Sequence, residues 1–221
     1  MEWTNEIISR FLKTDPATYG HYLGVSFMNS KIKPMNKRLK MIGPAYTVKL
    51  LGKDSCALYK ALQEAPKGSV IVIDHACDEL FASVGEMVAR NAKALGLAGI
   101  VTDGMATDSL WLEEMDFPVF SAGISVITTN VWCVSGQYDL PVSCGGAPVN
   151  PGDIIFGDAD GVVVMNPDNY EEYLINAEAA AQREIEMRKQ FAEGKVLLNS
   201  VDGLLEADIP KVIADNRIKK A

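Results

Sequence analysis

The sequence is poor in the residues that build soft-metal sites. Its 221 residues include two histidines and four cysteines, with no Cys-x-x-Cys pair and no His-x-x-x-His pair. Structural zinc sites take four such ligands at regular spacing, so this composition argues against them and against any multi-histidine centre. A metal in this protein must then be held by oxygen atoms, the ligands that Mg²⁺ and Mn²⁺ prefer. We expect reduced thiols at all four cysteines, which are Cys56, Cys77, Cys133 and Cys144.

Long hydrophobic runs and a signal leader are also missing. A membrane-spanning helix needs about 20 consecutive apolar residues, and no stretch approaches that length. We therefore expect a cytoplasmic protein with no membrane partner. The net charge of −8 and the sequence pI of about 4.8 predict a field that repels phosphates, so we expect no nucleic-acid partner. Residues 31–40, KIKPMNKRLK, could hold an anion, although such a run is more typical of a solvated loop.

Phosphate-binding and nucleophile motifs are absent as well. The sequence contains no Gly-x-Gly-x-x-Gly turn, no P-loop and no Gly-x-Ser-x-Gly elbow. These absences argue against dinucleotide binding, phosphoryl transfer and serine hydrolysis. Residues 144–152, CGGAPVNPG, carry prolines where a phosphate-binding helix would begin, so we expect a hairpin turn there.

The patterns that are present predict an α/β fold. Strand patterns at residues 69–76 and 98–104 flank a helix pattern at 83–95, which is typical of a β-α-β unit with parallel strands. Short strands rich in Gly, Pro and Asp follow, and a long helix is expected from residue 168 to residue 193. We expect one domain, residues 1–195, and a C-terminal helical arm, residues 196–221.

Four acidic residues stand where this unit would form a crevice. Asp74 and Asp103 end two neighbouring strands, Glu86 lies in the first turn of the helix between them, and Asp108 opens the next helix. Because ligands usually bind beyond the carboxyl ends of strands in α/β sheets, we expect these carboxylates to converge on a metal. Alternatively, Glu86 and Asp108 only complement helix dipoles, a contribution of about 0.3–1 kcal/mol each.

Four stretches of the chain form a recognisable series. They are GPAYTV (43–48), GEMVARNAKALGLAGIVTDGMATD (85–108), FPVFSAG (117–123) and VNPGDIIFGDADGVVVMNP (149–167). In this order and spacing they resemble the RraA-like family, which contains class II 4-hydroxy-4-methyl-2-oxoglutarate aldolases and regulators of ribonuclease E activity. The likeness spans residues 15–194.

The resemblance carries expectations about fold and site. It implies a swivelling β/β/α domain that assembles into a homotrimer or homohexamer, with a site between subunits. It further implies that Asp108 coordinates Mg²⁺, or Mn²⁺, directly and that Glu86 holds a metal-bound water. The substrate would lie against Thr107 and the backbone amides of Val84, Gly85, Glu86 and Met87.

Three positions depart from the family pattern. Family aldolases usually carry, at position 107, an arginine that binds the carboxylate of pyruvate, and the hydroxyl of Thr107 cannot replace a bidentate guanidinium. His21 stands where an aspartate is usual, and Val126 where a Gly-x-x-Pro step is common. The candidates for a replacement anion contact are Arg90, Arg38 and His75.

These features predict a divalent-metal-dependent lyase that acts on a 2-oxo acid. It would perform retro-aldol cleavage of 4-hydroxy-4-methyl-2-oxoglutarate-like substrates, oxaloacetate decarboxylation or both. Glu86, Asp108 and His21 are the candidate catalytic residues, with His21 or a water as general base, although His21 could equally be a turn residue. Lys49, the one candidate for Schiff-base chemistry, lies in a strand pattern typical of a structural residue. The alternative function is a non-catalytic regulator that binds a ribonuclease or another protein, which the missing arginine favours and the retained Glu86 and Asp108 do not.

Overall fold

The computed structural model describes residues 3–20 and 26–194. The chain divides after Glu178 into two compact units, of which the first holds the sheets and the second begins within the last described helix. The helices are α1 (Asn5–Leu12), α2 (Pro16–Tyr19), α3 (Cys56–Glu64), α4 (Glu86–Ala94), α5 (Ser109–Glu114), a 3₁₀ turn (Pro167–Asn169) and α6 (Tyr170–Ala192). The strands are β1 (Ser26–Phe27), β2 (Lys33–Pro34), β3 (Met41–Lys49), β4 (Val70–Asp74), β5 (Ala82–Val84), β6 (Gly99–Thr102), β7 (Met105–Ala106), β8 (Val119–Ser121), β9 (Gly123–Ile124), β10 (Gln137–Tyr138), β11 (Val142–Cys144), β12 (Ala147–Val149), β13 (Ile154–Asp158) and β14 (Gly161–Met165).

The main sheet has nine strands and mixes two kinds of pairing. Its order is β1-β14-β13-β3-β4-β6-β8-β2, with β10 paired to β3. The four central strands β3, β4, β6 and β8 run parallel, as the β-α-β pattern predicts, and the outer pairs are antiparallel. The expected α/β class and parallel core are confirmed.

Strand β3 connects the two kinds of pairing. Residues 41–44 pair antiparallel with β13, and residues 45–49 pair parallel with β4. The main chain of β3 therefore meets neighbours along its whole length. Most of its residues are buried because both faces of the sheet are covered: Val48 packs in the cluster with α3, and Ala45 in the cluster with Ala147 of β12.

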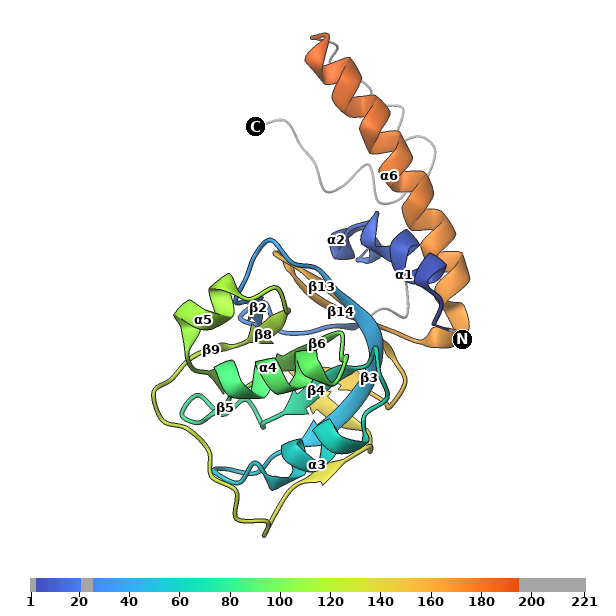
Figure 1. Ribbon diagram of the computed structural model, residues 1–221. Coiled ribbons are helices and arrows are strands. Elements are labelled where there is room, and N and C mark those ends of the chain that lie inside the picture. The colour runs from blue at the N-terminus through green and yellow to red at the C-terminus, as the bar shows by residue number, and fades with distance from the viewer. Residues whose placement is uncertain (1–2, 21–25, 195–221) are drawn as a thin grey trace, which may run out of the picture. The chain divides into compact units, whose positions relative to one another are not determined.

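Helices α3, α4 and α5 cover one face of the parallel strands (Figure 1). Their small and aliphatic residues, such as Ala61, Ala89 and Leu112, are fully buried against Ile71 and Ile100 of the sheet. Fully burying one aliphatic side chain of this size contributes about 1.5–3 kcal/mol. This cluster therefore holds α4 and α5, the helices that begin at the acidic residues, firmly on the sheet.

A second apolar layer joins the N-terminal helices to strands β13 and β14. Thr4 caps α1 by accepting a hydrogen bond from the N–H of Ile7, and the helix buries Phe11. The rings of Phe11, Tyr19 and Phe156 meet with centroids 5.7–5.9 Å apart. Such aromatic contacts add to the free energy gained from burial.

The hairpin expected from CGGAPVNPG is present. Strands β11 and β12 pair antiparallel, and Gly145 and Gly146 between them have φ of 55° and 82°. Two consecutive left-handed residues form the type of tight turn for which glycine is preferred.

One helix prediction needs correction. The helix expected from residue 83 begins at Glu86, because residues 82–84 form β5 and pair with β7. The long helix expected from residue 168 to residue 193 is present as α6, in which Tyr173 and Ala177 are buried. The predicted domain boundary at residue 195 lies at the edge of the described residues and stays a prediction.

The expectation of four reduced thiols is wrong for one pair. Cys56, the first residue of α3, and Cys133 form a disulfide across 77 positions of sequence, while Cys77 and Cys144 are free. Spacing could not predict this pairing, because residues so far apart meet only once the sheet has formed.

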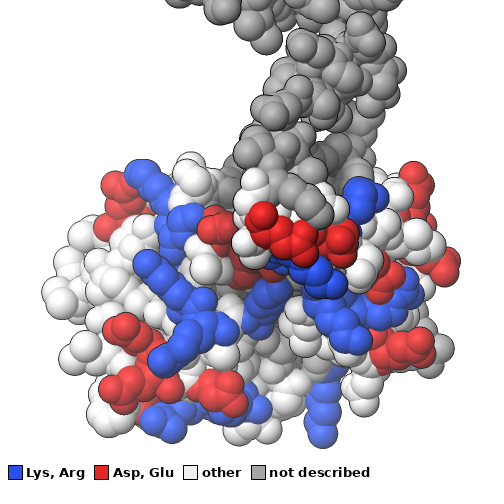
Figure 2. Space-filling view, turned by 90° about the horizontal axis from the view of Figure 1, so that it is seen from above, with Lys and Arg blue, Asp and Glu red and all other residues white. Residues whose placement is uncertain are grey.

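Charge and hydropathy agree with a mixed polar surface. Lys and Arg side chains are interspersed with Asp and Glu on the face seen in Figure 2.

Within residues 3–20 and 26–194, the structure contains no helix that is both long enough and apolar enough to cross a membrane.

Candidate functional site

The acidic residues Glu86 and Asp108 meet at the start of two helices. Glu86 is the first residue of α4, and Asp108 is the N-cap of α5 with a left-handed backbone, φ 54°. The Asp108 side chain does not cap its own helix. Instead its Oδ2 accepts a hydrogen bond of 2.9 Å from the backbone N–H of Glu86. Non-glycine residues in this conformation are uncommon and cluster at functional sites.

A small parallel sheet brings these residues together. Strands β5, β7 and β9 form it, and β5 and β7 end immediately before the loops that carry Glu86 and Asp108. The N–H of Thr107 donates to the carbonyl of Val84 at 2.9 Å, which extends this pairing by one step. The two carboxylate-bearing loops are therefore positioned by backbone hydrogen bonds.

Gly85 leaves room for the Asp108 carboxylate. A Cβ at this position would lie 2.5 Å from Oδ2 of Asp108 and 2.7 Å from Cγ2 of Thr107. The backbone of Gly85 is extended, with φ −136°, so any residue could adopt it. Glycine is thus needed at position 85 because a side chain there would overlap the Asp108 carboxylate.

Arg90 fixes the Glu86 side chain. Its Nε donates to Oε1 of Glu86 at 2.7 Å, one turn along α4. The Glu86 side chain is 18% exposed and that of Arg90 is 52% exposed. The remaining guanidinium N–H groups of Arg90 have no partner within the described part of the chain.

A hollow of about 550 Å³ extends from Arg90 between α4 and α5. It is lined by Arg90, Lys93, Ala94, Trp111, Glu114, Met115 and Asp116. Its lining lies toward the C-terminal ends of α4 and α5, and Arg90 is the lining residue that also contacts the acidic pair.

The donor set fits a hydrated hard cation. Among the described residues, no three His, Cys, Asp or Glu side chains converge as a metal cage. Mg²⁺ commonly takes only one or two protein carboxylates and keeps water or substrate oxygens in its other positions. Asp108 is exposed, and only one of its carboxylate oxygens has a hydrogen bond in the described structure. One direct carboxylate, with the backbone of a second acidic residue bonded to it, fits that mode of binding.

The predicted convergence of all four acids is wrong. Asp74 pairs with Lys49 at 2.6 Å and accepts the N–H groups of Ala76 and Ser143. Asp103 accepts from the backbone N–H groups of His75 and Gly145 and from the Cys77 thiol. Both carboxylates are buried. They hold the loops at the ends of β4 and β6 together, and Lys49 is engaged in the same network.

The other predicted residues have different environments. Val84 is buried at the end of β5, Met87 is exposed, and Thr107 is half-buried beside Gly85. Of the replacement anion contacts, His75 is buried with its Nε2 at 2.7 Å from the carbonyl of Gly52, and only Arg90 is bonded to a residue of the acidic pair. His21 lies outside the described residues.

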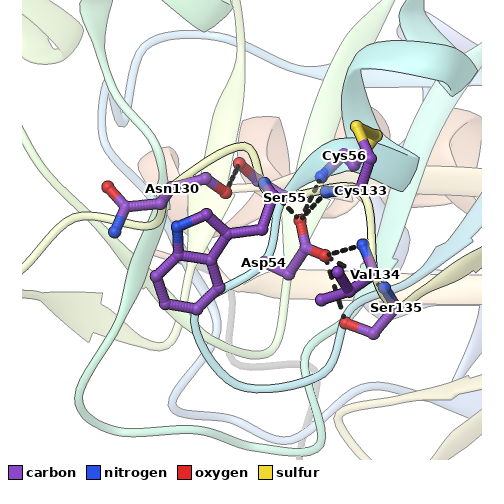
Figure 3. Close-up of a disulfide and its surroundings, with 8 residues drawn as sticks. Asp54, Ser55, Cys56, Asn130, Cys133, Val134 and Ser135 are labelled. Carbon is purple, nitrogen blue, oxygen red and sulfur yellow. Dashed lines mark hydrogen bonds between the residues drawn. A yellow bond between two sulfur atoms is a disulfide. The ribbon is translucent and has the colours of Figure 1, made fainter.

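A third buried carboxylate, Asp54, was not predicted as important. Asp54 accepts hydrogen bonds from the backbone N–H groups of Cys56, Trp132, Cys133, Val134 and Ser135, at 2.8–3.3 Å (Figure 3). Burial alone would raise the pKa of Asp54, but these donors outweigh burial and hold its pKa well below the usual range. The sequence pattern predicts a helix that begins near Asp54, but it does not indicate that residues 132–135 pack against this carboxylate.

Comparisons with known proteins agree with this geometry. A family model described as "RraA-like: Aldolase/RraA" matches residues 16–164. A Halalkalibacterium halodurans protein named "Putative 4-hydroxy-4-methyl-2-oxoglutarate aldolase" is 38% identical over 174 residues, which cover 79% of this chain and 82% of that protein. The solved structure of Streptomyces coelicolor RraAS2, described as an unusual member of the RNase ES inhibitor RraA protein family, matches with a TM-score of 0.70 and 27% identity over 85% of this chain and 98% of that one.

A third comparison bears on the fold alone. A solved structure of an uncharacterized protein from Pseudomonas syringae has a TM-score of 0.77 at 24% identity, and covers 89% of this chain and 93% of that one. The fold, the family model and the H. halodurans relative agree over most of the sequence. The chain therefore belongs to the RraA-like family, which includes both aldolases and RraA-type regulators.

Proposed function

We propose that this protein is a divalent-metal-dependent lyase that acts on a 2-oxo acid at the Glu86–Asp108 site. The reaction would be retro-aldol cleavage of a 4-hydroxy-4-methyl-2-oxoglutarate-like substrate, oxaloacetate decarboxylation or both. The name of the H. halodurans relative supports the aldolase reaction. Mg²⁺ or Mn²⁺, when bound, would supply the positive charge that stabilises the negative charge developing on the substrate's carbonyl oxygen.

One observation carries the proposal. The hydrogen bond from the Glu86 N–H to Asp108 holds an exposed carboxylate beside the N-terminus of α4. Within the described chain the other oxygen of Asp108, Oδ1, has no hydrogen bond, so it is available to a cation.

The chain's own groups can orient a substrate next to this carboxylate. The first-turn N–H groups of α4 beyond Glu86 have no acceptor within the helix, and such groups bind carboxylates. Arg90 holds Oε1 of Glu86, so Oε2 of Glu86 can accept a hydrogen from water. Thr107 cannot make the bidentate contact with a second substrate carboxylate that an arginine at this position makes. His21 stays a candidate base.

Metal binding and turnover test the proposal separately. Mn²⁺ affinity is measured by electron paramagnetic resonance, and pyruvate formation by coupling to lactate dehydrogenase. Asp108→Asn should weaken Mn²⁺ binding by at least about 10–100-fold, the range typical of lost metal-site partners, and abolish metal-dependent turnover. Glu113→Gln, an exposed acid on the same helix, is the matched control and should change neither. Unchanged Mn²⁺ binding by Asp108→Asn would show that the site is misassigned.

A second candidate function is a regulator that binds a ribonuclease or another protein. Thr107 in place of the family arginine favours it, as does the similarity to RraAS2. If Mn²⁺ binds at Asp108 but neither 4-hydroxy-4-methyl-2-oxoglutarate nor oxaloacetate is consumed, this candidate takes precedence.

A further inference from the structure

The disulfide Cys56–Cys133 ties a helix to an exposed loop. Cys56 begins α3, and Cys133 lies in the loop of residues 130–136, which connects toward β10. Figure 3 shows the Asp54 carboxylate beneath the disulfide, with its hydrogen bonds reaching the same loop. The disulfide and the hydrogen bonds to Asp54 are two independent interactions that hold residues 130–136 in place.

The disulfide is open to attack from solvent. Cys133 is exposed and has a left-handed backbone, φ 58°. Both cysteines line a hollow of about 470 Å³ together with Lys60, one turn further along α3. A structural disulfide is usually protected by burial, whereas exposed disulfides are typically the labile or regulatory ones.

We propose that Cys56–Cys133 is a reversible redox site that a dithiol reductant opens, and that it controls the order of residues 127–136. A thiolate of the dithiol attacks Sγ of the exposed Cys133. The sulfur–sulfur bond breaks, its electron pair passes to Sγ of Cys56, and this sulfur then takes up a proton. The second thiol of the reductant attacks the mixed disulfide and releases Cys133 as a thiol, so two electrons and two protons pass to the protein.

The helix explains why Cys56 is the leaving sulfur. A thiolate at the first residue of a helix is stabilised by the partial positive charge of the helix N-terminus. Lys60 adds a positive charge to the same hollow. Attack on Cys133 thus expels the better-stabilised thiolate.

The two free cysteines differ from the disulfide pair in their surroundings. Cys144 is buried, and burial raises the pKa of its thiol well above the ordinary value. Cys77 is exposed, but its thiol donates to Asp103, and partial desolvation followed by the charge of Asp103 raises its pKa. Both thiols are therefore poorer nucleophiles than an unperturbed cysteine, which favours exchange at the Cys56–Cys133 pair.

The loop is coupled to the strand that precedes the acidic pair. The N–H of Ala82 donates to the carbonyl of Ile127 at 2.8 Å, and the N–H of Thr129 donates to the carbonyl of Ala82 at 3.1 Å. Ala82 begins β5, which ends at Val84 next to Gly85. Opening the disulfide leaves residues 130–136 held by the Asp54 hydrogen bonds alone, which loosens this end of the segment. The proposed effect on catalysis rests on the proposed function, whereas the redox change does not.

The test uses the full-length wild-type protein, and its redox state is set without denaturant. After air oxidation the protein is unfolded in an alkylating agent without reductant, and peptide mass spectrometry should find Cys77 and Cys144 alkylated and Cys56 joined to Cys133. Dithiothreitol should convert the Cys56–Cys133 pair to thiols, a gain of about 2 Da. Hydrogen–deuterium exchange should then become faster in residues 127–136 and in residues 82–86, and it should return to the oxidised rate on reoxidation.

Variants separate the pair from the free thiols. Cys133→Ser should exchange like the reduced wild type and should not respond to dithiothreitol, whereas Cys77→Ser should keep the full response. The proposal is overturned if Cys56 and Cys133 are alkylated in the air-oxidised protein, if reduction requires denaturant, or if exchange in residues 127–136 is the same in both redox states. No readout depends on turnover, so failure here is distinct from failure of the proposed lyase activity.

Discussion

The backbone N–H of Glu86 donates a 2.9 Å hydrogen bond to the carboxylate of Asp108, 22 positions later in the chain. The bond closes the gap between the starts of α4 and α5, and the missing side chain of Gly85 makes it possible. A carboxylate so placed keeps its charge exposed while its direction is fixed. That combination suits a cation site better than a helix cap.

The Glu86 side chain provides a first prediction. Glu86→Gln keeps the backbone bond to Asp108 and removes only the side-chain charge. If Glu86 acts on the metal through water, the variant should bind Mn²⁺ about 10–100-fold more weakly. Stability should change by less than about 1 kcal/mol, because the pair with Arg90 is a surface ion pair. Titration calorimetry and urea unfolding measure both effects, and unchanged affinity would remove Glu86 from the site.

Gly85→Ala tests the space beside Asp108. The new Cβ would lie 2.5 Å from Oδ2, so the aspartate must move away from the Glu86 N–H. We expect metal-dependent activity to be lost together with Mn²⁺ affinity, and overpacking to cost about 1–3 kcal/mol of stability. Retained Mn²⁺ affinity would show that Asp108 does not need its present position.

Much of the fold could be predicted from local sequence patterns. The buried runs before Asp74 and Asp103 identify parallel strands because strands covered on both faces are continuously apolar. The Gly145-Gly146 step identifies a tight hairpin because only such residues favour two left-handed conformations in succession. The buried residues of α6 could not be predicted, since apolar spacing shows which side of a helix is hydrophobic but not which part of that side packs, as Tyr173 and Ala177 do.

The site was only half predictable for a related reason. The sequence pattern predicts that Asp74 and Asp103 lie at strand ends. It does not predict which backbone N–H groups donate hydrogen bonds to their carboxylates. Glu86 and Asp108 meet through β5 and β7, strands of three and two residues that are too short to give a sequence pattern. The hydrogen bonds of Asp54 and the neighbouring disulfide both involve a loop more than 70 positions later in the chain. Ser135, for example, donates its backbone N–H to Asp54.

Asp54 makes a prediction about pH. Its pKa is lowered in the folded protein, so its stabilising effect is complete when the carboxyl is ionised in both states. As the pH falls below the unfolded pKa of about 3.9, the unfolded state binds a proton first and this stabilisation is lost. Asp54→Asn should be less stable than wild type at neutral pH, and the difference should shrink between about pH 5 and pH 3.

Urea unfolding at several pH values measures this difference. Asp116→Asn is the control, because the side chain of Asp116 is 89% exposed, and its stability should follow that of wild type at each pH. A constant difference between Asp54→Asn and wild type would mean that the Asp54 carboxyl has an ordinary pKa in the folded state.

Assembly is the next prediction. The chain is expected to form a homotrimer or homohexamer, and large apolar side chains such as Val126 and Leu110 are strongly exposed in the single chain. Light scattering at micromolar concentration should give three or six times the chain mass of 24.0 kDa. A monomeric mass would contradict this expectation and with it a site between subunits.

Thr107 makes the last prediction, because it separates this chain from the usual family aldolases. Its backbone N–H is bonded to Val84, and its methyl group lies beside Gly85 at the acidic pair. A longer side chain at this position would therefore start beside the Glu86–Asp108 pair, where the proposed function places the substrate. Without a guanidinium there, transition-state stabilisation should be lower by about 2–4 kcal/mol, or roughly 30- to 1000-fold in kcat/KM.

Wild-type protein should thus cleave 4-hydroxy-4-methyl-2-oxoglutarate poorly, and Thr107→Arg should raise its pyruvate-forming activity. Thr107→Lys is the matched variant: it restores the charge without the two-pronged geometry, so it should recover less activity than arginine. Steady-state kinetics on this substrate and on oxaloacetate, at saturating Mg²⁺, compare the three proteins. If Arg90 already supplies the anion contact, wild type will be as fast as Thr107→Arg, and Arg90→Ala will then abolish turnover that Thr107→Arg restores.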